Sequence, residues 1–115
     1  MGLTATEAAY RFGIEWKDSL LNVISSNYYY MKDTLESEIP DIVVYALEGT
    51  YLPMLDLRSV VPEEQVHNLI QNKCHIAVDY GEVFGECARG FIRLNLATEP
   101  RYVKTAVERI IENLK

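Results

Sequence analysis

Two polar residues near the end of the chain, Arg93 and Asn95, have the types and spacing needed to bind a carboxylate. Apolar and polar residues alternate around them, as they do along a half-buried strand. This pattern places Arg93 and Asn95 on one face, and directs three apolar residues to the core: Ile92, Leu94 and Leu96. A planar guanidinium matches the two oxygens of a carboxylate. The alternative from spacing alone is a solvated outer face of a sheet.

Four further residues are of metal-ligating types: Cys74, His75, Asp79 and Cys87. Their spacing matches no zinc pattern, and the chain has no Cys-x-x-Cys pair. A nucleophilic thiol would need a histidine partner, and no motif assigns His67 or His75 to that role. We therefore predict no metal site, and we expect Cys74 to lie in the core.

The segment Gly81–Gly90 is rich in glycine and could be taken for a phosphate-binding loop. No Gly-Lys-Ser or Gly-Lys-Thr follows it, which excludes a P-loop. No helix is expected to begin there, which excludes a dinucleotide-binding fingerprint. We interpret the segment as a connector.

The first element that the sequence predicts is a long helix. Apolar residues recur at the helical period from the N-terminus to Glu38, and Pro40 ends the pattern. Thr4 and Glu7 have the spacing of a capping box, so a start near Thr4 is expected. Such a helix would be about 50 Å long. Gly13 leaves an alternative open, in which two shorter helices meet at that residue.

The later elements give the order α-β-β-α-β-β-α. They are expected at Ile42–Tyr45 (strand), Tyr51–Leu57 (strand, antiparallel to the first, with Pro53 at an edge or bulge), Pro62–Cys74 (helix, apolar at Val66, Leu69, Ile70 and Cys74), Ile76–Val78 (strand), Phe91–Leu96 (strand) and Pro100–Leu114 (helix). This order predicts an α/β fold of the α+β sandwich kind. A small mixed or antiparallel sheet is covered by helices within a single domain, residues 1–115.

Composition limits the partners and the compartment. The chain has 115 residues, a net charge of −6 and a sequence pI of about 4.9, with no basic cluster. An acidic surface disfavours nucleic acid and anionic membranes. We find no signal peptide, no apolar run near the roughly 18 residues of a membrane span, and only two cysteines. These features predict a cytoplasmic protein with reduced thiols.

Three segments together resemble one family. They are Thr6–Tyr10 followed by Gly13, Glu15 and Trp16; Glu48–Leu52 followed by Asp56; and Phe84-Gly85 followed by Gly90–Ala97. Their order resembles the C-terminal part of pyridoxal-phosphate enzymes of the aspartate aminotransferase fold. Within these, the opening segment is most similar to the MalY/PatB-type cystathionine β-lyases, which are C–S lyases. The resemblance covers essentially the whole chain.

The resemblance implies that residues 1–38 are a linking helix and residues 39–115 the small C-terminal domain of a longer homodimeric enzyme. The large domain that binds pyridoxal 5′-phosphate would be absent from this chain. Arg93 matches the arginine that binds the α-carboxylate of the amino-acid substrate, and Asn95 is expected to support it. The family's Schiff-base lysine lies upstream, so no catalytic or cofactor-binding residue is expected here, and the isolated chain is expected to be inactive.

The implied reaction of the whole enzyme is α,β-elimination, which releases a thiol, pyruvate and ammonia while the small domain closes over the site. Two departures from the family pattern leave the substrate preference open: Pro53-Met54 stands where relatives tend to have Ala-Trp, and Asp79-Tyr80-Gly81 where many have Asn-Pro-Gly. Three other functions remain open: an aminotransferase domain, a stand-alone amino-acid-binding or regulatory module, and an oligomerisation domain.

A missing domain would also leave surface uncovered at the start of the first helix. The candidates are Ala5, Ala8, Ala9 and Phe12. We expect this end to fray or to pack on another copy of the chain.

Overall fold

The computed structural model describes all residues from Met1 to Lys115. Its N-terminal part is two helices, α1 (Gly2–Phe12) and α2 (Ile14–Glu38), which meet at Gly13. The expectation of one unbroken helix is therefore wrong, and the alternative of two helices is confirmed. A Cβ at position 13 would lie 2.5 Å from the carbonyl oxygen of Ala9, so the close turn at the junction requires glycine.

The expected capping box is also wrong. Helix α1 begins at Gly2, which places Thr4 inside its first turn, and no side chain caps its N-terminus. The side chain of Glu7 instead forms an ion pair with Arg11 at 2.7 Å, one helical turn further on.

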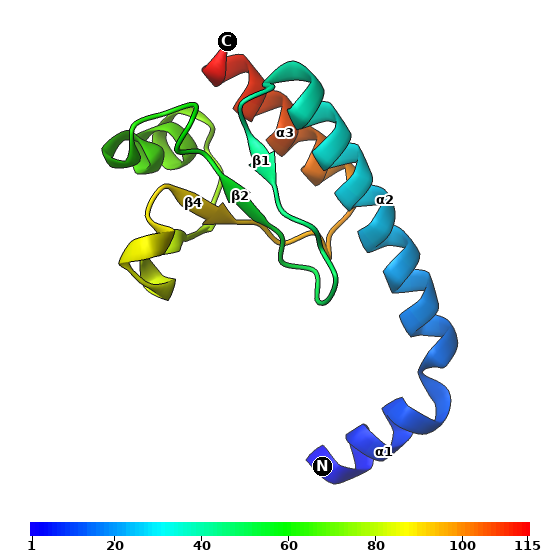
Figure 1. The fold of residues 1–115 in the computed structure, drawn as a ribbon. Helices are drawn as coiled ribbons and strands as arrows, with labels where there is room; N and C mark the ends of the chain where they lie inside the picture. Colours follow the sequence, from blue (N-terminus) through cyan, green and yellow to red (C-terminus); the bar gives the residue numbers. More distant parts are fainter.

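Four short strands form one antiparallel sheet, in the order β1-β2-β4-β3. The strands are β1 (Val43–Val44), β2 (Met54–Asp56), β3 (Asp79–Tyr80) and β4 (Phe91–Arg93). Helices α2 and α3 (Pro100–Leu114) pack together and cover one face of the sheet (Figure 1). The predicted α+β sandwich, with β1 antiparallel to β2, is confirmed.

Several boundaries differ from the expectation. Strand β2 is an inner strand, so the prediction that Pro53 marks an edge or a bulge is wrong; the strand begins one residue later, because proline has no N–H for the sheet. The predicted strand Ile76–Val78 is also wrong, and β3 follows it at Asp79–Tyr80.

Short 3₁₀ and π-helical segments occur where one long helix and an irregular connector were expected. In place of one helix over 62–74 there are a 3₁₀ turn η1 (Glu63–Gln65) and a π-helical segment η2 (Asn68–Lys73). The connector after β3 contains two 3₁₀ turns, η3 (Gly81–Phe84) and η4 (Glu86–Ala88).

The core lies between the sheet and helices α2 and α3. Along β4 and the residues after it, the side chains expected to point inward are all buried: Ile92, Leu94 and Leu96. The apolar stripe of α3 lies against them, with Val103, Val107 and Ile110 buried. The inner face is thus fixed, and Arg93 must lie on the outer face.

Helix α1 extends away from this core and buries none of its residues, as predicted (Figure 1). Phe12 is 79% exposed and Leu3 is 90% exposed. The projecting helix gives the chain a long dimension of 48 Å, against 28 and 23 Å in the other two directions. None of the helices combines the length and the apolar character needed to cross a membrane.

Candidate functional site

The outer face of the sheet brings Arg93 next to residues from two other strands. Arg93 pairs in register with Met54 of β2 on one side and with Asp79 of β3 on the other. Directly opposed residues of an antiparallel pair point to the same face. Arg93 therefore occupies the middle of a three-residue row on the face opposite the helices.

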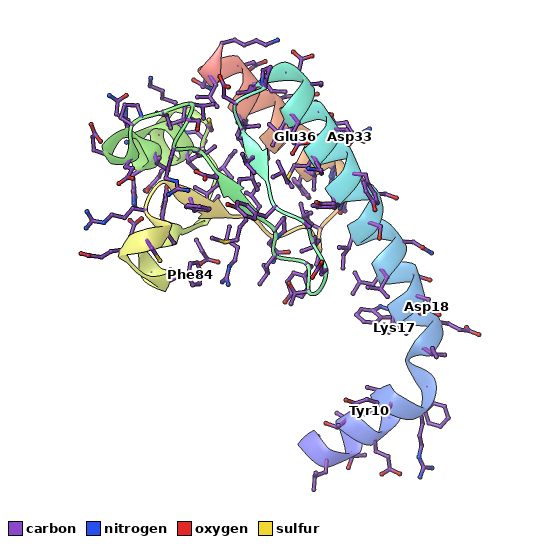
Figure 2. The ribbon with its side chains drawn as sticks, viewed as in Figure 1. Tyr10, Lys17, Asp18, Asp33, Glu36 and Phe84 are labelled. Carbon is purple, nitrogen blue, oxygen red and sulfur yellow. The ribbon has the colours of Figure 1, made fainter.

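The guanidinium of Arg93 is held by two contacts. Its Nε and Nη2 atoms both donate hydrogen bonds to Oδ2 of Asp79, at 3.1 and 2.8 Å. Its plane lies over the ring of Phe84, with 4.5 Å from Cζ to the ring centroid. Phe84 comes from η3, the turn beside β4, where Figure 2 labels it. Ring and carboxylate together fix the orientation of a side chain that is 30% exposed.

A second arginine on the same face provides a comparison. Nε and Nη2 of Arg58 donate to the two different oxygens of Asp56, at 2.9 and 2.7 Å, which is a complete bidentate pair. The side-chain hydrogen bond from Arg58 lowers the pKa of Asp56 below its ordinary value. Arg58 stacks on Phe91 at 4.5 Å. Each forked donor of Arg58 thus has a carboxylate oxygen of its own, whereas the two donors of Arg93 share one.

Asn95 lies on the same side of the chain as Arg93, but no hydrogen bond joins the two side chains. The Oδ1 atom of Asn95 accepts a hydrogen bond from the backbone N–H of Ala97 at 2.9 Å, a local turn that asparagine favours. The residues that contact Arg93 are instead Asp79 and Phe84, neither of which the sequence analysis placed beside it.

An apolar hollow of about 500 Å³ is lined by Met54 and Phe91, which lie on the same face of the sheet as Arg93. Met54, the cross-strand partner of Arg93, is part of its wall. Most of the lining is hydrophobic and includes Tyr45, Leu52 and Phe91. A cationic fork whose cross-strand neighbour lines an apolar hollow is suited to a ligand that has a carboxylate at one end and an apolar part at the other.

The lysines do not provide a site for pyridoxal phosphate. Lys17 and Lys115 form ion pairs with Asp18 and Glu38, and Lys104 lies over the ring of Tyr30. Lys73 is exposed at the end of η2.

Lys32 is the one partly buried lysine, and it donates to Glu36 at 2.5 Å. This hydrogen bond raises the pKa of Lys32, whereas a lysine that attacks a carbonyl must be able to lose its proton. The residues of this chain therefore do not by themselves fit the cofactor.

The residues considered as metal ligands or nucleophiles are dispersed. Cys74 is buried, as predicted, and burial raises the pKa of its thiol, while Cys87 is exposed. No three histidine, cysteine, aspartate or glutamate residues lie together as metal ligands would. Nε2 of His67 is bound to Glu82, and this hydrogen bond lowers the pKa of Glu82.

No protein-family model matches the chain. Protein MalY of Escherichia coli K12 is 28% identical over 116 residues, a match that covers all of this chain and 30% of MalY. LL-diaminopimelate aminotransferase of Chlamydia pneumoniae is 31% identical over 64 residues, which covers 54% of this chain and 16% of that enzyme.

Solved structures have the same fold. The structure of a C–S lyase from Staphylococcus hominis with bound pyridoxal phosphate superimposes with a TM-score of 0.86 and 28% identity. This match covers 96% of the present chain and 30% of the lyase. The chain thus spans about 30% of the length of the relatives that match nearly all of it. Most of these relatives are cystathionine β-lyases.

Proposed function

We propose that this chain, whose homologues and structural neighbours are pyridoxal-phosphate-dependent C–S lyases, is the small substrate-binding domain of such an enzyme. In this proposal Arg93 binds the α-carboxylate of the amino-acid substrate. The observation that carries it is the position of Arg93. It is the one outer-face arginine whose two forked donors share a single oxygen, and its cross-strand partner Met54 lines an apolar hollow.

The proposed role of Arg93 is orientation. The rigid strand β4 and the stacked ring of Phe84 limit the rotamers of the guanidinium, so a carboxylate that binds it is held in one direction. The hollow beside Met54 would then receive the rest of the substrate. In this proposal Asn95 does not bind the carboxylate, and it supports Arg93 only indirectly, through the turn that it forms with Ala97 after β4.

The remaining parts of the enzyme belong to the proposal as well. Residues 1–38 would link this domain to a large cofactor-binding domain, and residues 39–115 would close over the substrate. The C-terminal half of α2 already belongs to the core formed with the sheet, through Met31 and Leu35. The complete enzyme would be a homodimer of the cystathionine β-lyase kind.

Replacing Arg93 by lysine tests the carboxylate assignment. Lysine keeps the positive charge but loses the planar fork, so kcat/KM for pyruvate release from cystathionine should fall about tenfold, or about 1.4 kcal/mol. The measurement requires the polypeptide that carries this chain together with its cofactor domain. Arg101→Lys on exposed α3 is the matched control and should leave kcat/KM unchanged. Equal kcat/KM for the Arg93 variant and the wild type would rule out the assignment.

A second candidate is an aminotransferase domain, favoured by the match to LL-diaminopimelate aminotransferase. The same assay separates the two functions. A lyase releases pyruvate from cystathionine without any added 2-oxo acid, whereas an aminotransferase needs the oxo acid to turn over.

The isolated chain is expected neither to bind pyridoxal phosphate nor to catalyse. The reason is that its lysines are paired, exposed or protonated, as described above. Equilibrium dialysis of the 115-residue chain against micromolar pyridoxal phosphate should show no stoichiometric uptake. One equivalent bound per chain would contradict this proposal.

A further inference from the structure

Asp79 occupies the position at which a ligand carboxylate would meet Arg93. We propose that Asp79 competes with the substrate carboxylate for the guanidinium of Arg93 and must leave it before that carboxylate binds. Asp79 thereby sets the affinity of the site. This proposal rests on the carboxylate site proposed above. The contact that carries the proposal is the pair of hydrogen bonds from Nε and Nη2 of Arg93 to Oδ2 of Asp79.

The backbone keeps this competitor in place. Asp79 is the direct partner of Arg93 in the β3–β4 register, so the two side chains start from opposed positions on the same face. Strand β3 is an edge strand that pairs only with β4. The aspartate therefore remains next to the guanidinium after it is displaced, and its effective concentration is that of an attached group.

The ion pair between Arg93 and Asp79 can readily be replaced by one between Arg93 and a ligand carboxylate. Both donors of Arg93 point at one oxygen of Asp79, whose side chain is 53% exposed. The neighbouring pair of Arg58 uses both oxygens of Asp56, which is only 13% exposed. An exposed ion pair with an incomplete fork is weak, because water and salt compete for it. An incoming carboxylate that uses two oxygens forms the better fork.

The size of the effect follows from the fraction of chains in which Arg93 is free. The apparent Kd of a ligand equals its intrinsic Kd divided by that fraction. An exposed ion pair of ordinary strength would leave roughly one chain in five free. Removing the charge of Asp79 should then tighten carboxylate binding about fivefold.

The test is a titration of the 115-residue chain with sodium acetate, at constant ionic strength maintained with sodium chloride. The signal is the Nε–H resonance of Arg93 in ¹⁵N-edited NMR spectra, assigned by its loss in Arg93→Lys. The wild type is compared with Asp79→Asn, which keeps the shape of the side chain but removes the charge. Asp56→Asn is the matched control, because it removes the same charge from the same face without contacting Arg93.

The expected result is an apparent Kd about fivefold lower for Asp79→Asn and unchanged for Asp56→Asn. Equal affinities in the wild type and Asp79→Asn, with an acetate-dependent shift at Arg93 in both, would overturn the competitor while the carboxylate site stands. The same gain in both asparagine variants would reduce Asp79 to a general charge effect, and would overturn the proposal too. No shift of the Arg93 resonance in any variant would overturn the carboxylate site, and the competitor with it.

Discussion

The variant Gly81→Ala is expected to lose about 3 kcal/mol of unfolding free energy. Gly81 is buried at the start of η3, and a Cβ there would lie 1.7 Å from the carbonyl oxygen of Ala88 and 3.0 Å from Cβ of Phe91. Backbone atoms cannot rotate away as a flexible side chain can, so η3, η4 or β4 must shift. Urea unfolding followed by circular dichroism measures the loss.

The matched control is Gly49→Ala, because a Cβ at Gly49 has nothing within 4 Å. It should change the unfolding free energy by less than about 0.5 kcal/mol. The displacement of η3 caused by Gly81→Ala should also change the surroundings of Arg93, since η3 carries Phe84 onto that guanidinium. A Gly81→Ala protein as stable as the wild type would show that the tight contact with Ala88 is not present in solution.

The variant Asn27→Ala is expected to lose about 2 kcal/mol. Asn27 is 3% exposed, and its Nδ2 donates to the carbonyl oxygens of both Leu96 and Thr98 at 3.0 Å. Alanine leaves both oxygens without their donor in a place that water does not readily reach, and each lost bond of this kind costs about 1 kcal/mol. The same urea titration measures it.

Asn22→Ala is the control, since Asn22 is exposed on the same helix α2. This control should behave as the wild type within about 0.5 kcal/mol. If both asparagine variants were equally stable, the two bonds that join α2 to the segment after β4 would contribute nothing net.

Local patterns allowed the helical and strand faces to be predicted well. The period of the last helix predicted bounds near Pro100 and Leu114, and the structure has the helix at Pro100–Leu114. The alternation along Phe91–Leu96 separated the buried Ile92 from the outward-facing Arg93. Both signals come from neighbouring residues on one element, and burial enforces them directly.

The partners of Arg93 could not be predicted, because they depend on pairing between strands. Asp79 meets Arg93 across 14 residues of chain, and the strand that carries Asp79 was expected three residues too early, at Ile76–Val78. A displacement of one residue in a strand reverses the face of every side chain. The carboxylate role of Arg93 itself came from the family resemblance and remains a proposal.

Asn27 was overlooked, although its signal was present. It lies between Ile24 and Met31 at helical spacing, on the stripe that faces the core. A polar residue at such a position must find hydrogen-bond partners, because an unpaired buried amide is costly. The spacing could therefore have indicated a buried contact, but not that its partners would be Leu96 and Thr98.

Helix α1 is exposed along its whole length, so packing against the rest of the chain does not stabilise it. A helix of 11 residues is too short to be stable alone in water, because its nucleation cost is spread over few bonds. None of its side chains is buried, so no packing against residues 39–115 offsets the free-energy cost of helix nucleation. Residues 2–12 should therefore stay helical only while another surface covers Phe12 and Leu3. The amide-exchange rates of residues 2–12 report directly on whether such a surface is present.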